Sequence, residues 1–159
     1  MEQISKVITV EEHFMSEKVN GEYQKLLEKK NLTLAQKAKA NFIQQFVAKG
    51  EITEVGEKRL EFMETHGIDC QILSYGNNSP SYLDPKQAVV LCQMANEKLA
   101  GYCKQYPGNF YGFAVLPVGD TGAALTELER AVKTLGLKGI IFNGAYQESY
   151  CCMAPAFCR

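Results

Sequence analysis

The stretch RLEFMETHGIDCQILSYG, residues 59–76, passes from a helical pattern to a strand pattern within a few residues. Its first part completes TEVGEKRLEFMETHG, residues 53–67, which predicts a helix that stops at Gly67, a residue type favoured just after a helix C-terminus. Its second part, residues 68–76, predicts a strand whose apolar residues suit a sheet buried on both faces. A helix that leads directly into a buried strand is a building block of α/β folds.

The same alternation of helices and strands extends along the chain in both directions from this stretch. Capping residues mark several helix boundaries, among them Asp84 followed by Pro85, and Asp120. Since helices connect the strands, we expect parallel pairing with right-handed crossovers, and therefore an α/β fold. The first predicted strand begins at Ile8, the others cover residues 68–76, 110–117 and 138–144, and the predicted helices cover residues 21–31, 33–50, 53–67, 85–105 and 121–135.

The first strand starts with an apolar pattern that predicts burial, with Ile8 and Val10 in the core. Two carboxylates and an imidazole follow at once, in ITVEEHFM, residues 8–15. Side chains alternate along a strand, so Glu11 and His13 are predicted to point the same way and Glu12 the other way. Carboxylate oxygens and imidazole nitrogens are ordinary ligands for a divalent transition metal such as zinc. The alternative for such a short motif is that these residues only cap a solvated surface strand.

The place of these residues in the fold favours metal binding. Ligands of parallel α/β folds bind at the C-terminal ends of the strands. Glu11 and His13 stand at the end of the first strand, and the later strands end at Ser74, Tyr75, Pro117 and Asn143. One rim of the sheet is thus expected to collect the polar residues, and we predict that Glu11 and His13 are metal ligands.

The composition is that of a soluble globular protein and not of a disordered one. Of the 159 residues, 46% are apolar and 22% are charged. The formal net charge of −1 gives no reason to expect a nucleic acid or an anionic membrane as partner. No basic segment leads into an apolar one at the N-terminus, and no apolar run approaches the ~20 residues of a membrane span, so a cytoplasmic protein is predicted.

Three of the six cysteines and the second histidine are assigned structural roles. Cys70 lies in a predicted strand, and Cys92 and Cys103 lie in a predicted helix, where they act as small buried hydrophobic residues. His66 lies in the last turn of a helix, where an imidazole suits the helix dipole. All six cysteines are predicted to be reduced thiols, with a small zinc site as the alternative for the C-terminal cluster of Cys151, Cys152 and Cys158.

Four segments, spaced in register over roughly residues 5–144, carry a family resemblance. They are VEEHF at residues 10–14, the helix-to-strand stretch at residues 59–76, MANEKLAGYCKQYPGNFYGFAVLPVGD at residues 94–120 and AALTELERAVKTLGLKGIIFNG at residues 123–144. The chain resembles the amidohydrolase-related family that includes the metal-dependent, non-oxidative decarboxylases of hydroxybenzoates.

The resemblance implies a TIM-type (β/α)8 barrel with one metal ion at the strand ends, often zinc and in some members manganese. Glu11 and His13 would be its first two ligands, and the E-x-H form, in place of H-x-H, resembles the hydroxybenzoate decarboxylase branch. In that branch the metal holds the substrate carboxylate and an adjacent phenolic oxygen, an aspartate on a late strand protonates the ring carbon, and carbon dioxide leaves. Asn143, which follows the fourth strand, is a candidate for lining the substrate pocket.

The chain departs from the family pattern in its length and in its last residues. A (β/α)8 barrel typically has about 250 residues and eight strands, whereas four strands are predicted here. We therefore expect residues 1–144 to form the N-terminal half of such a barrel and residues 145–159 to be a divergent tail. The resemblance implies, for the full-length protein, metal-dependent decarboxylation or hydrolysis of a small aromatic or related carboxylic acid. The late metal ligands and the catalytic aspartate of the family have no counterpart in this sequence, so the isolated chain is expected to be inactive.

Two other interpretations stay open. The chain could be an inactive form that acts only by association with another copy or with a full-length paralogue, or it could be an artefact of gene prediction with no settled role. A half-barrel leaves its first and fourth strands as apolar edges without a strand partner, and such edges are templates for pairing with another chain. Self-association is therefore predicted.

Overall fold

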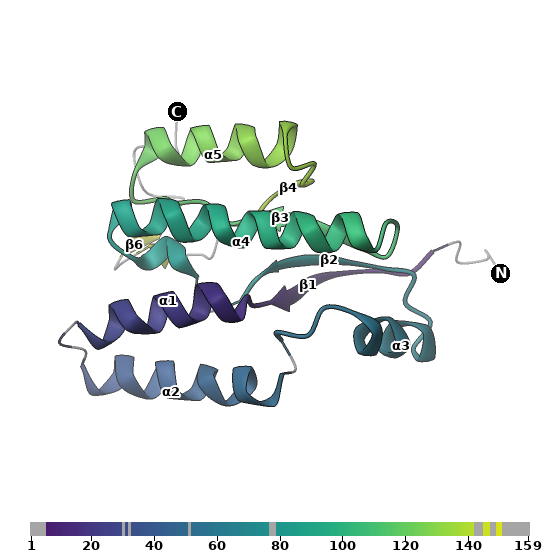
Figure 1. Ribbon diagram of the computed structural model, residues 1–159, viewed down its shortest axis with the longest axis horizontal. Coiled ribbons are helices and arrows are strands. Elements are labelled where there is room, and N and C mark those ends of the chain that lie inside the picture. The colour runs from purple at the N-terminus through teal and green to yellow at the C-terminus, as the bar shows by residue number, and fades with distance from the viewer. Residues whose placement is uncertain are drawn as a thin grey trace.

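The computed structural model describes residues 6–29, 31, 33–50, 52–76, 79–141, 145–146 and 149–150. Its centre is a sheet of four parallel strands in the order β1-β2-β3-β4, joined by helices (Figure 1). The predicted α/β class is therefore confirmed. The strands are β1 (Ile8–Phe14), β2 (Cys70–Tyr75), β3 (Phe110–Ala114) and β4 (Gly139–Ile140).

The helices follow the predicted order, with α4 and α5 lying side by side along the sheet (Figure 1). Two helix starts differ from the prediction. The first helix begins earlier, because the Ser16 side chain accepts a hydrogen bond from the Val19 amide and caps it. The third begins later, after an extended Gly56. The helices are α1 (Glu17–Glu28), α2 (Leu34–Lys49), α3 (Glu57–Thr65), α4 (Pro85–Gln105) and α5 (Thr121–Lys133), with a 3-10 turn η1 (Pro80–Tyr82) and a short hairpin of β5 (Ala145–Tyr146) and β6 (Ser149–Tyr150).

The core lies between the sheet and α4, which has an apolar stripe at helical spacing that is buried apart from its half-buried last member, Cys103. A glycine in the sheet lets this helix approach closely. A Cβ added to Gly112 of β3 would lie 2.6 Å from Cδ2 of Leu99, which is closer than two carbon atoms can pack. The buried stripe consists of Ala88, Cys92, Ala95 and Leu99.

The start of β1 does not belong to the core, contrary to the prediction that it is a buried strand. Ile8 is 52% exposed and Val10 is 58% exposed. The reason is the position of β1 at one edge of the described sheet, where it pairs with β2 alone. An edge strand receives packing from fewer neighbours than a central strand, so a run of apolar residues does not by itself ensure burial.

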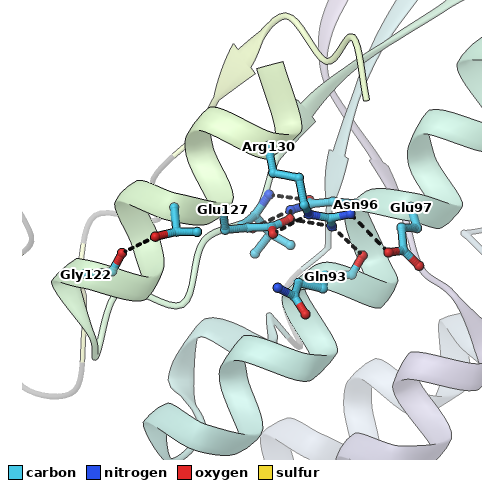
Figure 2. Close-up of polar contacts among 8 residues, drawn as sticks. Gln93, Asn96, Glu97, Gly122, Glu127 and Arg130 are labelled. Atoms are coloured by element: carbon cyan, nitrogen blue, oxygen red, sulfur yellow. Dashed lines mark hydrogen bonds and ion pairs between the residues drawn. The ribbon is translucent and has the colours of Figure 1, made fainter. Parts of the chain in front are cut away.

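A buried polar cluster of Asn96, Glu127 and Arg130 joins α4, α5 and the end of β3 (Figure 2). Asn96 Oδ1 accepts from the Val115 amide at 2.9 Å, and its Nδ2 donates to the Val115 carbonyl at 2.9 Å. The same Nδ2 donates to Oε1 of Glu127 at 2.7 Å. Glu127 is only 1% exposed, although the sequence pattern assigns it to no apolar stripe. Its burial was not predicted.

Arg130 balances the charge of this buried carboxylate. Its Nε donates to Oε2 of Glu127 at 2.7 Å and its Nη2 donates to Oε1 at 2.8 Å, a bidentate arrangement. Hydrogen bonding to Glu127 raises the pKa of Arg130. The guanidinium also reaches Glu97 on the surface, at 3.1 Å. The cluster therefore places a paired charge, and not an isolated one, inside the fold.

We predict that Asn96→Ala lowers the free energy of unfolding by about 3 kcal/mol, because the Val115 main chain and one Glu127 oxygen lose their partner in a buried place. Urea unfolding followed by circular dichroism measures this. Glu97→Ala is the matched control, since it removes only an exposed contact to Arg130 and is expected to change the free energy by less than about 0.5 kcal/mol. Equal losses in both variants would contradict the role given to the buried cluster.

Candidate functional site

The C-terminal end of β1 contains an irregularity exactly where the candidate ligands lie. Thr9 is opposite Gln71 and Glu12 is opposite Leu73, so two residues of β1 face one residue of β2, which is a β-bulge. Glu11 lies in this bulge with a φ of 63°. A residue other than glycine in this left-handed region costs about 1 kcal/mol or more.

The bulge removes the argument from strand alternation that Glu11 and His13 point the same way. Regular alternation along β1 is interrupted between Thr9 and Glu12, so alternation does not determine the direction of the Glu11 side chain. Glu11 and His13 are both exposed at the end of the strand. Their convergence on one metal ion therefore stays a prediction.

His13 is oriented by the neighbouring strand. A hydrogen bond of 3.0 Å joins its Nδ1 to Oγ of Ser74, which is buried at the end of β2. Because this contact engages Nδ1, Nε2 of the same ring stays available to a ligand. Histidines that bind metals are commonly held in this way through their second nitrogen. The predicted collection of polar residues at the strand ends is thus seen for His13 and Ser74.

The main chain of His13 is held by a residue of α3. Nη2 of Arg59 donates to the His13 carbonyl oxygen at 2.9 Å. Arg59 lines a groove together with Glu12, Glu54 and Gln71. Burial lowers the pKa of the Arg59 guanidinium, and the charges of Glu12 and Glu54 oppose this effect. Arginine stays protonated in proteins, so the groove holds a positive charge beside two carboxylates.

The other residues named from the sequence have structural places. Tyr75 and Pro117 are buried, and burial raises the pKa of the Tyr75 hydroxyl. His66 caps the end of α3, where its Nδ1 donates to the Phe62 carbonyl at 2.8 Å and its ring stacks on Phe62, so its predicted structural role is confirmed. Asn143 lies outside the described residues.

The cysteines that the structure describes are free thiols, as predicted. Cys70 and Cys92 are buried and Cys103 is half-buried. Burial raises the pKa of all three thiols, that of Cys103 to about 11, so they are protonated at neutral pH. The predicted roles of Cys151, Cys152 and Cys158 fall outside the described residues.

A complete metal site would need further ligands. Within the part of the chain that the structure describes, no group of three or more histidine, cysteine, aspartate or glutamate side chains is placed to hold a metal ion. A catalytic zinc ion usually takes three protein ligands. Glu11 and His13 fit the donor types of such a site and would supply part of it.

Among the described residues, no helix has the length and apolar character needed to cross a membrane.

The four parallel strands joined by helices place the chain in the class of proteins built on parallel βα units. A family model described as Amidohydrolase matches residues 40–151, more than half of the 159-residue chain. The chain therefore belongs to the amidohydrolase family, and the predicted resemblance is confirmed. Glu11 and His13 precede the matched residues.

Several relatives are decarboxylases, and the chain spans less than half the length of those it matches. Gamma-resorcylate decarboxylase of Rhizobium radiobacter is 39% identical over 100 residues, which cover 61% of this chain and 30% of that protein. The crystal structure of 5-carboxyvanillate decarboxylase from Novosphingobium aromaticivorans, complexed with manganese and 4-hydroxy-3-methoxy-5-nitrobenzoic acid, has a TM-score of 0.85 at 26% identity. That similarity covers 99% of this chain and 46% of the other.

A further solved structure agrees. Dihydroxybenzoic acid decarboxylase from Polaromonas sp., with bound manganese and the inhibitor 2-nitroresorcinol, has a TM-score of 0.69 at 29% identity, over 89% of this chain and 39% of the other. These relatives are TIM-barrel proteins, so the four parallel strands described here are part of such a barrel. The predicted partial barrel is confirmed.

Sequence patterns did not reveal two contacts of this site. Ser74 was expected at the rim but not as the partner of His13, and the segment around Arg59 was identified without a role for its side chain. Both contacts join residues far apart in the chain, at separations of 61 and 46 positions. The bulge at Glu11 was also missed, because a glutamate carries no local signal for a left-handed backbone.

We predict that Glu11→Gly leaves the free energy of unfolding unchanged or raises it by up to about 1 kcal/mol, because glycine adopts a positive φ without a steric clash. The matched variant Glu12→Gly, at a position without a positive φ, is expected to lower it by about 1 kcal/mol. Chemical unfolding of both variants measures the difference. A similar loss in both would mean that the Glu11 side chain stabilises the fold by more than its backbone strain costs.

Proposed function

We propose that this chain supplies the first metal ligands of a TIM-type barrel whose activity is metal-dependent decarboxylation of a small aromatic carboxylic acid. The observation that carries the proposal is the hydrogen bond of 3.0 Å between Nδ1 of His13 and Oγ of Ser74, which engages one ring nitrogen of an exposed histidine and leaves Nε2 available to a metal ion. The exposed carboxylate of Glu11 lies two positions earlier on the same strand. Resemblance to decarboxylases at 26–39% identity supports this activity over hydrolysis.

Manganese is the metal we propose for this site. Zinc, expected first from the ligand types, has no counterpart in the two solved relatives described above, which hold manganese. Carboxylate and imidazole donors suit either ion. When bound, such a metal would supply a Lewis acid and a template for the carboxylate of the substrate.

The residues of this chain have distinct parts in the proposal. His13 would present Nε2 to the metal and Glu11 would present a carboxylate oxygen, while Ser74 keeps the imidazole ring in one orientation. Asn143 is proposed to line the substrate pocket because it follows the fourth strand in the sequence. No residue of this sequence is assigned as the acid that protonates the ring, so we expect the isolated chain to have no measurable decarboxylase activity.

The metal assignment is tested by titrating the metal-free chain with Mn²⁺ and following free Mn²⁺ by electron paramagnetic resonance. We expect weak binding, because two protein ligands hold an ion less tightly than three. His13→Ala and Glu11→Gln should each abolish it. His66→Ala, which removes the other histidine of the chain, should have no effect. Binding that is unchanged in His13→Ala would refute the assignment and direct attention to the C-terminal cysteines.

A second candidate function, association with another chain, is favoured by a specific observation. β1 and β4 are the edges of the described sheet, and β1 exposes the apolar side chains of Ile8 and Val10. Exposed apolar edge strands pair readily with other strands. In this interpretation the chain would act through a second copy of itself and not through catalysis.

We therefore predict that the chain is heavier than its monomer mass of 17.7 kDa in light scattering coupled to size exclusion at micromolar concentration. Val10→Lys should shift the population towards the monomer, because it places a charge on the exposed edge. Leu125→Lys changes an equally exposed apolar residue on α5, so it should leave the mass unchanged. A monodisperse 17.7 kDa species with cooperative unfolding would rule this association out.

A further inference from the structure

His13 is held from two directions by residues distant in the sequence. Nδ1 of its ring is hydrogen-bonded to Oγ of Ser74 on β2 at 3.0 Å, and its main-chain carbonyl oxygen accepts from Nη2 of Arg59 on α3 at 2.9 Å. The first contact orients the imidazole, as described above. The second acts on the backbone that carries the imidazole.

The carbonyl of His13 needs a partner other than β2. The Phe14 carbonyl accepts from the Gly76 amide at 3.0 Å, on the side of β2. Successive carbonyls of a strand point in opposite directions, so the His13 carbonyl points away from β2, towards the free edge of β1. Arg59 donates to it there, where no neighbouring strand of the described sheet does so.

The segment that leads into α3 holds the strand end at a second point. The Met15 amide donates to the Ile52 carbonyl at 2.7 Å, two residues after His13. Both anchors therefore come from residues 52–59, and together they span the part of the chain where β1 passes into α1. Arg59 lies in a groove with Glu12 and Glu54, whose charges attract its guanidinium. These neighbours limit the conformations of the Arg59 side chain.

A strained residue lies two positions before the anchored carbonyl. Glu11 has a φ of 63°, a conformation that a free strand end would leave for a lower-energy one. We propose that Arg59 is a positioning residue, which fixes the main chain at His13 and thereby holds Glu11 and His13 in the geometry that binds the metal ion. This inference rests on the proposed metal site. In this role Arg59 acts through the backbone of His13 and is itself no metal ligand.

Two measurements on the 159-residue chain test this role. Arg59→Met keeps the length of the side chain and removes the donor, and we expect it to weaken Mn²⁺ binding by about 10- to 100-fold, as is typical when a partner behind a metal ligand is lost. Hydrogen exchange should become faster at residues 10–16 and stay unchanged in α4. Arg59→Lys keeps the charge without the planar fork and should show a smaller loss. Lys58→Met, from the same helix and groove, is the matched control and should behave as the wild type.

The outcomes separate this inference from the proposed function. If Arg59→Met equals Lys58→Met in both Mn²⁺ affinity and exchange at residues 10–16, the positioning role is wrong. If the wild type binds no Mn²⁺, the proposed metal site fails, whereas exchange at residues 10–16 still decides whether Arg59 fixes the strand end. If Arg59→Met also loses protection from exchange in α4, its effect is not local, and Arg59→Lys is then compared with the wild type in its place. The inference would be overturned if Arg59→Lys had the same hydrogen exchange at residues 10–16 and the same Mn²⁺ affinity as the wild type.

Discussion

Inside the helical layer, the side-chain amide of Asn96 donates to and accepts from the main chain of Val115 at 2.9 Å and also donates to Glu127 at 2.7 Å. Unpaired polar groups in such a place would cost several kcal/mol together, roughly the size of a large mutational effect. The packing of α4 against α5 and the exit of the chain from β3 are therefore coupled. Because Val115 directly follows β3, the same contact fixes the position of the C-terminal end of this strand.

The end of β1 depends on a different kind of interaction. Phe14 packs into the core, but Glu11 and His13 before it are exposed and receive little apolar packing. Hydrogen bonds from Ser74 and Arg59 hold this end, and the bulge at Glu11 stores some backbone strain. Strain and solvent exposure at the edge of a well-packed unit are common at functional sites, where stability is given up for geometry. The C-terminal end of β3 is thus held by buried contacts, whereas that of β1 is held by a few hydrogen bonds at the edge of the sheet.

Local signals predicted most of the helix boundaries correctly. Asp84 and Asp120 cap α4 and α5 as expected, and Gly67 has the positive φ expected just beyond α3. These features depend on a few consecutive residues, so the sequence carries them in full. The starts of the first and third helices and the burial of the strand at Ile8 were predicted wrongly. Burial depends on neighbours that the local pattern does not include.

The sequence by itself determined the α/β class, the order of the elements, the family and His13 as a candidate ligand, since each follows from short-range periodicity or from a motif. Only the tertiary structure decided that Glu11 lies in a bulge, that Ser74 orients His13, that Arg59 holds its backbone and that Glu127 is buried with Asn96. Each of these facts depends on the register between segments far apart in the chain. That register arises when the strands and helices pack together, and no local pattern encodes it.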